Sequence, residues 1–551
     1  MTAAEGVADS AVVRRLARGS LLTRLISRGR QPLRLLAVPR DHVQGDRRRG
    51  DALLAGKLVA GSEVLSLPDL DFAAVGASVP LARHLQGFSW LRDLAAAASR
   101  EKGARIAEAL AGRWLIAHGT RIDEAWRPEL WGERILFWTA YAPYILSSRD
   151  GGYRSALLNT LARGARHLNA NADRAPPGLR RITAWAGVVT ASLLLQGGVA
   201  RIARGEAGLG RALATGQFDD GGLVSRTPYE QTLLVDRLGL LRAAYAAGKQ
   251  TLPDGFEAAA AAALAALEGV TTGDGALSSW QGGNPSEAAR VSGVIDGCGM
   301  RARLLRQPRG WGFHRLSALG TAVVIDAAPP PPARMAQAGC ASTLAFELCD
   351  GQQRLIVNCG GPGDLPSAIP GELADALRTT AAHSALTVAD TNSTAILADG
   401  SIGKGVTDVV IDRSEENDFS RIDASHDGYV RSFGLLHRRT LVLGNDGKEL
   451  RGTDRLTART GRRSKAAVPF AVRFHLASGI EPTITADGMG AILRSPGAPP
   501  WNFRSRGAAI AVEESLMIDG RANPRRTMQL VLNGETAGGG AEVQWQFRRS
   551  S

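Results

Sequence analysis

The sequence predicts a chain of at least two domains, with a helical part first and a part made of antiparallel strands second. Apolar residues recur at helical spacing from about residue 88 to 268 and alternate at the period of a strand after residue 310. A chain of 551 residues is also too long for a single hydrophobic core. The change of pattern predicts a junction near residues 300–315.

The N-terminal residues 1–50 are predicted to form a basic extension. Residues 12–36 mix Leu, Val and Ile with arginines, and no clean apolar segment of a signal peptide follows them. Val12 to Ser27 has the pattern of a basic amphipathic helix, which suits weak contact with an anionic membrane surface. A solvated extension is the more common alternative. The lack of an export signal leads us to expect a cytoplasmic protein.

The helical part begins near Phe88. Residues 50–85 are mixed, with short apolar runs and several turns. After them, apolar residues share one face over residues 88–97, 106–115, 135–145, 157–168, 182–195, 199–215, 230–247 and 256–268. No fixed sequence period is present, so a simple repeat family is not supported. We predict helical hairpins packed around an axis or stacked in a row.

Residues 219–230 predict the start of one of these helices. Thr227 is a good N-cap, Pro228 suits the first helical turn, and Glu230 completes a capping box. Gly248 is the expected stop.

The same segment carries a candidate site. Gly221 and Gly222 allow the backbone to approach a ligand closely, and the start of a helix favours an anion. Arg226 and Tyr229 stand beside it. An arginine can clamp a carboxylate and a tyrosine can transfer a proton, although a purely structural cap explains the pattern equally well.

The second part of the chain reads as strands joined by turns. Asp350-Gly351 predicts a hairpin between two alternating runs. Strands are predicted over residues 319–326, 344–348, 354–358, 385–389, 407–413, 420–425, 437–443, 468–476, 480–486, 491–494, 508–513, 527–532 and 541–547. This spacing predicts a large antiparallel sandwich.

Charge and cysteine content limit the classes of function. The formal net charge of +13 and the pI of about 10.2 suit a polyanionic partner, such as an acidic polysaccharide, nucleic acid or anionic lipid. The chain has 4 cysteines and no close CxxC pair, so neither a disulfide scaffold nor a zinc ribbon is predicted. No apolar run is long enough for a membrane span.

Five groups of residues, taken together and in order, resemble a known family. They are Asp220 to Tyr229, Leu344 to Leu348, Arg378 to Leu386, Ser425 to Tyr429 with His437 to Arg439, and Arg473 to His475. The chain is similar to the heparinase II/III-like polysaccharide lyases from about residue 80 onward. The resemblance implies an incomplete (α/α) toroid over residues 51–310, followed by an antiparallel β-sandwich over residues 311–551.

The resemblance also implies a reaction, the β-elimination of a polysaccharide that contains uronic acid. The uronate carboxylate must be neutralised so that negative charge can spread into it. A base then removes the neighbouring proton, and an acid protonates the leaving glycosidic oxygen. Tyr and His usually share these two roles in the family, and no cofactor is needed for the elimination.

The sequence departs from the family pattern at several positions. No histidine lies between Gly178 and Leu195, where relatives carry Asn-His on a toroid helix. Ala338-Gly339-Cys340 stands in place of a His-x-His pair, and Asn358 replaces an aspartate. Glu230 occupies the usual place of the family tyrosine. Because Asn is a poor zinc ligand, we predict no tightly held metal ion.

From this resemblance we assign candidate site residues. The candidate catalytic residues are Tyr229, His383 and Arg226, and the candidate substrate-binding residues are His426, Tyr429 and Arg378. His437 and His475 fall within strand patterns and are predicted to be structural. Arg226→Ala is expected to remove activity or substrate binding while leaving the fold intact.

Two other functions are considered. A non-catalytic protein that binds an acidic glycan is favoured by the missing histidines, whereas Arg226, Tyr229 and His383 favour a lyase. Nucleic-acid binding is suggested only by the charge. Aromatic residues do not interleave with the basic residues, so a base-stacking platform is not predicted.

Overall fold

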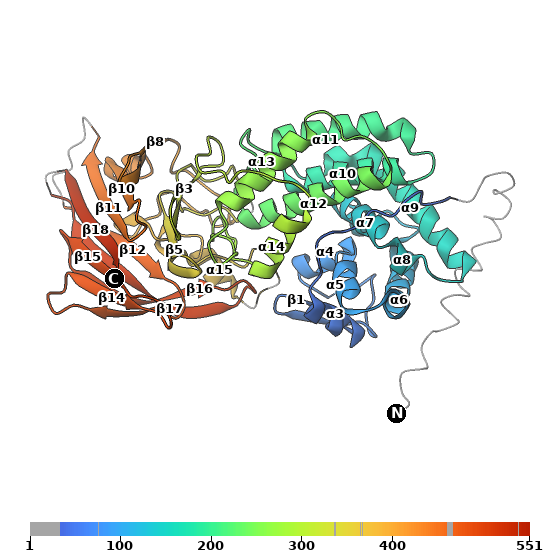
Figure 1. Ribbon diagram of the computed structural model, residues 1–551, viewed down its shortest axis with the longest axis horizontal. Coiled ribbons are helices and arrows are strands. Elements are labelled where there is room, and N and C mark those ends of the chain that lie inside the picture. Colours follow the sequence, from blue (N-terminus) through green and yellow to red (C-terminus); the bar gives the residue numbers. More distant parts are fainter. Residues whose placement is uncertain are drawn as a thin grey trace, which may run out of the picture. The chain divides into compact units, whose positions relative to one another are not determined.

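The computed structural model describes residues 33–550, except residues 75, 336–337, 364, 366, 368, 460–466 and 538. The predicted helix Val12–Ser27 lies outside the described residues. The chain divides into two compact units, each described here by itself (Figure 1). Unit 1 comprises the described residues up to Gly216, with Leu233–Ala260 and Gly293–Met300. Unit 2 comprises Gln217–Thr232, Ala261–Ser292 and Arg301 onward, so no single boundary separates the two.

Unit 1 is mainly helical, as predicted. Its central helix, α10 (Leu179–Leu194), is buried over Ile182–Leu194 and packs against its neighbours along most of its length. A helix that is apolar all round belongs inside a helical assembly. Around it lie α4 (Val79–Gly87), α5 (Trp90–Ala97), α6 (Arg100–His118), α7 (Pro128–Ala140), α8 (Ala142–Ile145), α9 (Gly151–Asn171) and α11 (Ile202–Gly216).

The described end of the predicted N-terminal extension packs within unit 1. The amide of Leu36 donates to the carbonyl of Leu194 at 2.8 Å. The carboxylate of Asp41 accepts hydrogen bonds from Arg92 and Tyr141. Short elements that the sequence analysis did not predict follow, namely α3 (Arg47–Leu54), β1 (Lys57–Ala60) and β2 (Glu63–Ser66).

Three helices continue the helical part, and each has residues in both units. They are α12 (Pro228–Ala247), α13 (Phe256–Gly269) and α14 (Ala288–Gly297). The predicted start of α12 is confirmed, because the amide of Gln231 donates to the carbonyl of Thr227 as the helix begins. None of the described helices is both long and apolar enough to cross a bilayer.

Unit 2 holds two large antiparallel sheets among the described residues. The first has eight strands in the order β13 (Glu481–Ile484), β14 (Gly490–Arg494), β15 (Trp501–Arg506), β18 (Gly540–Arg549), β11 (Glu449–Ala458), β10 (Leu435–Gly444), β9 (Phe419–His426), β8 (Val409–Glu415). The second runs β16 (Ile510–Ile518), β17 (Pro524–Glu535), β12 (Pro469–Leu476), β6 (Gln353–Val357), β5 (Phe346–Asp350), β4 (Thr321–Asp326), β3 (Phe313–Ala318), with β7 (Leu386–Val388) paired to β12.

The two sheets pack face to face, which confirms the predicted sandwich. Phe346 and Phe474 of the second sheet contact Trp545 of the first, with ring centroids 5.3 and 4.9 Å apart. All three side chains are buried in one core that draws residues from both sheets. Burial of large aromatic surface is the main stabilising contribution here.

The predicted hairpin at Asp350-Gly351 joins β5 to β6, and Gly351 has a φ of +55°. In the described part of unit 2, three strands were not predicted, namely β3, β11 and β15. Polar side chains point inward from the first two, including His314 in β3 and Asp454 in β11, and this breaks the expected alternation.

Candidate functional site

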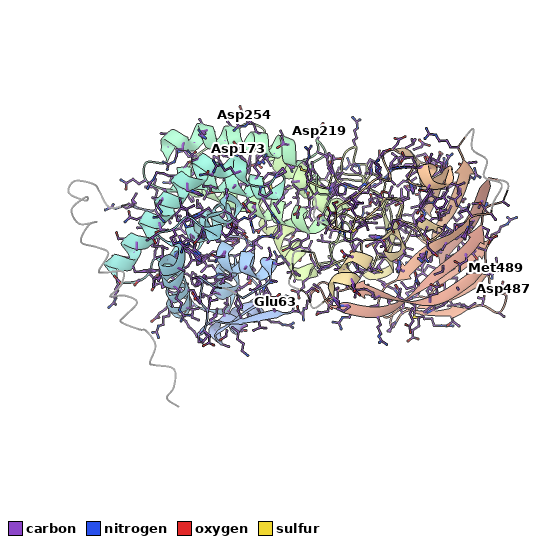
Figure 2. All side chains as sticks on the ribbon, turned by 180° about the vertical axis from the view of Figure 1, so that it is seen from behind. Glu63, Asp173, Asp219, Asp254, Asp487 and Met489 are labelled. Atoms are coloured by element: carbon purple, nitrogen blue, oxygen red, sulfur yellow. The ribbon has the colours of Figure 1, made fainter. Side chains whose placement is uncertain are left out.

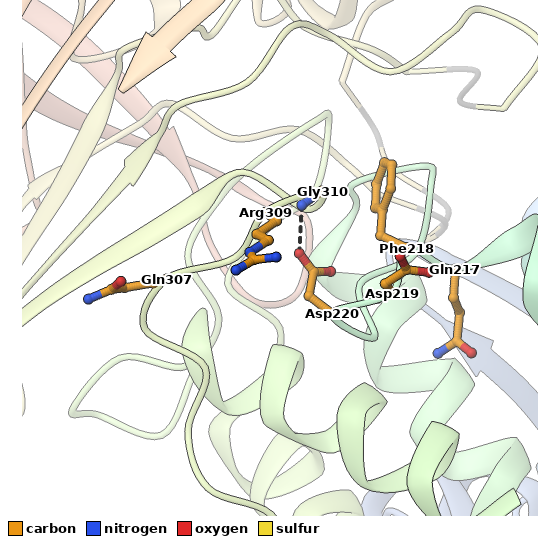
Figure 3. Close-up of a pocket in the computed structure, with 7 residues that line it drawn as sticks. All are labelled: Gln217, Phe218, Asp219, Asp220, Gln307, Arg309 and Gly310. Atoms are coloured by element: carbon orange, nitrogen blue, oxygen red, sulfur yellow. Dashed lines mark hydrogen bonds between the residues drawn. The ribbon is translucent and has the colours of Figure 1, made fainter. Parts of the chain in front are cut away.

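A pocket of about 560 Å³ lies in unit 2, where two loops meet (Figure 3). One loop joins α11 to α12, and the other precedes β3. The lining residues are Gln217, Phe218, Asp219, Asp220, Gln307, Arg309 and Gly310.

Asp220 ties the two loops together. Its carboxylate accepts hydrogen bonds from the amides of Gly310 at 2.7 Å and Trp311 at 3.0 Å. The amide of Gly222 donates to the other carboxylate oxygen at 3.2 Å. Gly221 has a φ of +88° and its backbone lies against Ala262, where a Cβ atom would clash. The glycines therefore serve close backbone packing, which keeps the pocket in place.

The pocket offers side chains that are still available to a ligand. Asp219, labelled in Figure 2, is exposed, as are Gln307 and Arg309, labelled in Figure 3, and none of them has a side-chain partner among the described residues. Phe218 is half-buried beside Gly310. A guanidinium, an amide and a partly exposed ring are groups that together bind an acidic sugar.

Next to the pocket lies a segment that we call the arginine ridge, made of Arg301, Arg303, Arg306 and Arg309. All four side chains are exposed, and none forms an ion pair within the described part of the chain. Arg413 anchors the ridge, because its guanidinium donates to the carbonyls of Arg306 at 3.1 Å and Arg315 at 2.9 Å. The ridge therefore presents positive charge from a fixed backbone.

Arg226 lies in the interior of unit 2. Its side chain is 2% exposed, and its guanidinium forms an ion pair of 2.5 Å with Asp326 at the end of β4. It also donates to the carbonyls of Trp311 and Pro329 at 2.8 and 2.7 Å, and it lies over the Phe313 ring. These surroundings differ from those of an arginine that binds a substrate carboxylate, because the Asp326 carboxylate already occupies the position that the sugar carboxylate would take.

Asp326 connects Arg226 to the region of His383. Its second oxygen accepts a hydrogen bond from Ser342 at 2.7 Å, and Gln281 donates to it at 3.4 Å. Burial lowers the pKa of His383, against the opposing charge of Asp326. The structure thus brings Arg226 and His383 into one buried polar cluster rather than onto a common surface.

His383 and the candidate binding residues are also engaged within the protein. The Nδ1 of His383 donates to the carbonyl of Thr379 at 2.7 Å. The guanidinium of Arg378 donates to the carbonyl of Gly339 at 2.9 Å, while its Nη2 is buried without a partner. The hydroxyl of Tyr429 donates to the carbonyl of Leu386, and burial raises the pKa of Tyr429.

His426 belongs to a second buried cluster within the sandwich. Its Nε2 lies 3.1 Å from Nδ1 of His437, whose Nε2 lies 2.8 Å from a carboxylate oxygen of Asp454. Arg439 pairs with the same carboxylate. Burial lowers the pKa of both histidines, and Arg439 and His437 hold the pKa of Asp454 below its usual range despite burial. This fits the structural role predicted for His437.

Tyr229 is the candidate that keeps access to solvent. It is half-buried in the first turn of α12, and the guanidinium of Arg290 lies 5.8 Å from its ring centroid. The catalytic role of Tyr229 stays a prediction, as do the roles of the other five candidates.

No group of three or more His, Cys, Asp or Glu side chains able to hold a metal ion is found in the described ranges. Burial raises the pKa of the Cys340 thiol to about 12. Asn358 hydrogen-bonds Glu347 and Ser384 instead of facing an open site. The residues at the family's metal position therefore do not fit a zinc ion. The Nδ1 of His475 lies 3.6 Å from Sγ of Cys359, and burial lowers the pKa of His475 to about 3.

The pocket and the arginine ridge were missed by sequence reasoning. Residues 217–220 and 307–310 are separated by about ninety positions, and the hydrogen bonds of Asp220 and the contact of Phe218 with Gly310 bring them together. The one available signal was the density of arginine over residues 301–309.

Comparisons with known proteins agree with this fold. Residues 300–546 match the family described as heparinase II/III-like, C-terminal. The match to a crystal structure of heparinase III spans 98% of this chain and 91% of the heparinase III chain, with a TM-score of 0.71 at 12% identity. The match to the heparan sulfate lyase HepC of Pedobacter heparinus spans 99% of this chain and 91% of the HepC chain, with a TM-score of 0.58 at 16% identity.

One curated relative matches nearly the whole chain. It is FtsZ-localized protein C of Caulobacter vibrioides, 27% identical over 545 residues, which are 94% of this chain and 91% of the relative. The lyase structures establish the toroid and sandwich architecture across the chain and leave its activity open.

Proposed function

We propose that this chain, whose residues 300–546 are a heparinase II/III-like C-terminal domain, is a lyase-like protein that binds an acidic polysaccharide without cleaving it. The proposal goes beyond the lyase-like fold in two points. The chain is expected to have kept the binding of an acidic glycan and to have lost the elimination reaction.

The arginine ridge beside the pocket is the observation that carries the proposal. Four exposed guanidinium groups without ion-pair partners among the described residues adjoin a pocket with Gln307, Asp219 and Phe218. Guanidinium groups bind carboxylates and sulfates with paired hydrogen bonds. The anionic groups of a sugar chain would lie along the ridge, where the charge is positive, while the Asp219 carboxylate in the pocket would accept hydrogen bonds from sugar hydroxyls.

Loss of the elimination reaction is supported by the state of the candidate catalytic and substrate-binding residues. A general base must lie within hydrogen-bond reach of the proton that it removes. Tyr429, His383 and His426 are each 1% exposed and are hydrogen-bonded inside the protein. Arg226 neutralises Asp326 rather than a substrate carboxylate. Tyr229 differs from these candidates in being only half-buried.

The first prediction separates binding from cleavage. The purified chain is expected to bind heparan sulfate, hyaluronan, alginate or a bacterial exopolysaccharide in a titration. It is not expected to generate the ultraviolet absorbance of an unsaturated uronate. Arg303→Gln combined with Arg306→Gln should weaken binding about five- to thirtyfold, if each exposed contact is worth roughly 0.5–1 kcal/mol.

Arg525→Gln with Arg526→Gln is the control for net charge, because it removes the same formal charge from exposed positions of β17, where Arg525 pairs with Asp519. Equal loss of affinity in both double variants would mean that only net charge matters, and the ridge would be rejected. An absorbance increase that Tyr229→Phe abolishes would instead identify an active lyase.

A second candidate function is association with FtsZ. The relative named FtsZ-localized protein C matches 94% of this chain, so the likeness extends over both units. We expect the chain to sediment together with purified FtsZ polymers and to stay in solution without them. Sedimentation that is the same with and without FtsZ would remove this candidate. The predicted cytoplasmic location and membrane contact of residues 1–50 stay predictions.

A further inference from the structure

The outward face of the first sheet of the sandwich is polar and rich in arginine. On β15, Trp501, Phe503 and Ser505 point into the core, whereas Arg504 and Arg506 are exposed. On β18, Val543, Trp545 and Phe547 are buried and the alternate residues face outward. This alternation is that of a sheet with one face on the core and the other in water.

Four of the outward arginines form a line that we call the arginine stripe. It contains Arg494 of β14, Arg504 and Arg506 of β15, and Arg548 of β18, all exposed. The strand register sets their order. Across β15 and β18, Arg548 lies opposite Asn502. Arg504, two residues further along β15, lies opposite Gln546. Arg494 lies just beyond the pair Leu493–Trp501 at the other end.

The spacing of the stripe follows from strand geometry. Outward positions on one strand are about 7 Å apart and neighbouring strands are about 5 Å apart. The stripe from Arg494 to Arg506 therefore extends over roughly 20 Å, nearly parallel to the strands. Such a line fits a linear chain that carries a negative charge at regular intervals.

The stripe differs from the rest of this face in its ion pairs. Arg455 pairs with Glu542, and Arg438 pairs with Asp423. In contrast, Arg506 and Arg548 have no side-chain partner in the described part of the chain. Arg504 has a solvent-exposed pair with Asp487, labelled in Figure 2, and Arg494 donates to the Thr483 hydroxyl. Exposed pairs of this kind exchange easily with another anion.

Uncharged hydrogen-bonding groups lie between these arginines. Gln546 lies between Arg504 of β15 and Arg451 of β11 in the register, and its amide has no partner among the described residues. Asn502 neighbours Arg548 and donates to the Ser550 hydroxyl. Amides alternating with guanidinium groups suit a ligand that alternates hydroxyl groups with anionic groups.

We propose that the arginine stripe is a second binding surface, separate from the pocket, that takes a strand of acidic polysaccharide along β14, β15 and β18. The inference does not depend on the pocket, because no residue of the stripe lines it. Two surfaces on one chain let a long polymer bind twice, so affinity is expected to rise steeply with polymer length.

An acidic polysaccharide fits the stripe better than a single-stranded nucleic acid does. Single-stranded nucleic acids are held by aromatic side chains on which the bases stack, in addition to positive charge. The aromatic residues of β15 and β18, namely Trp501, Phe503, Trp545 and Phe547, all point into the core. The outward positions of these strands offer only guanidinium, carboxylate and amide groups.

The test uses the full chain and fluorescently labelled heparan sulfate in a short and a long form. Arg506→Gln with Arg548→Gln is expected to weaken binding of the long form about three- to thirtyfold. It should also reduce the gain in affinity from short to long polymer. Arg525→Gln with Arg526→Gln, which removes the same charge from the second sheet, should leave both affinities nearly unchanged.

The outcomes distinguish this proposal from the proposed function. If the stripe variant behaves like the β17 control while the ridge variant loses binding, the stripe is rejected and the pocket stands. If the stripe variant loses binding and the ridge variant does not, the pocket fails and the stripe stands. If duplex DNA of matched charge is weakened as much as heparan sulfate, the stripe is a general polyanion contact and the assignment to a polysaccharide is overturned.

Discussion

Replacing Arg226 with alanine is expected to lower the free energy of unfolding by about 3–5 kcal/mol, because the change leaves Asp326 charged and unpaired in the interior. The two side chains are 2% and 1% exposed, so water cannot take over the lost interaction. The carbonyls of Trp311 and Pro329 lose their donor as well. Denaturant unfolding followed by fluorescence and circular dichroism measures the change.

A second variant separates charge from packing. Arg226→Ala with Asp326→Asn removes the uncompensated charge, while the amide oxygen can still accept from Ser342. This double variant is expected to be more stable than Arg226→Ala alone. A stability of Arg226→Ala within about 0.5 kcal/mol of the parent, the range of ordinary surface changes, would contradict the buried pair.

The same variants revise the result expected from the sequence. If Arg226 were exposed and bound the substrate carboxylate, Arg226→Ala would lose glycan binding and keep an intact fold. The buried pair instead predicts loss of stability, and any loss of binding should follow the fraction of unfolded protein. Binding that disappears in fully folded Arg226→Ala would restore the substrate-binding role of Arg226.

Mild acid is expected to destabilise unit 2 well before carboxylates titrate. Burial lowers the pKa of His314 to about 4 and of His475 to about 3, and it lowers the pKa of His426 well below its ordinary value. These groups stay neutral in the folded state. In the unfolded chain they gain protons as the pH falls below about 6.5.

The sign follows from proton linkage. The folded pKa lies below the unfolded one, so the stabilisation is fully present above about pH 6.5 and is lost as the pH falls toward the folded values. His314 and His475 each contribute about 1.4 kcal/mol per pH unit in this window, so the two together cost roughly 3 kcal/mol by about pH 5.5, and the lowered pKa of His426 acts in the same direction. Burial raises the pKa of Glu347, which opposes this loss near the lower end.

Unfolding midpoints measured at about pH 7.5 and 5.5, either side of the unperturbed histidine pKa, test the expectation. His314→Gln is a suitable variant, because Nδ1 of His314 is buried without a hydrogen-bond partner and little bonding is lost. It should reduce the proton uptake on unfolding by about one proton. A midpoint that does not change over this range would contradict the buried neutral histidines.

Much of the strand pattern followed from local sequence. Leu344, Phe346 and Leu348 alternate with polar or small residues, and they lie in or beside β5 with their apolar side chains in the core. The strand β11 was missed because Asp454 points inward, to be paired with Arg439 and His437. A buried charge in a strand cannot be recognised before its distant partners are known.

The candidate site shows the same limit. Local sequence correctly placed the start of α12 at Pro228. It did not show that Arg226 points to Asp326, which lies 100 positions away. The motif at Asp220 looked like a ligand-binding helix start. In the fold, the Asp220 carboxylate instead fixes the loop of Gly310 and Trp311.

The sequence by itself determined the order of helices and strands, the sandwich and the resemblance to the lyase family, because apolar periodicity and turn residues act over a few positions. Only the tertiary structure decided which polar side chains form ion pairs or hydrogen bonds inside the protein and which face solvent. An ion pair or a hydrogen bond depends on where folding brings its two partners. In this chain Arg226 was brought to Asp326 and His426 to His437, while Arg303, Arg306, Arg506 and Arg548 were left exposed.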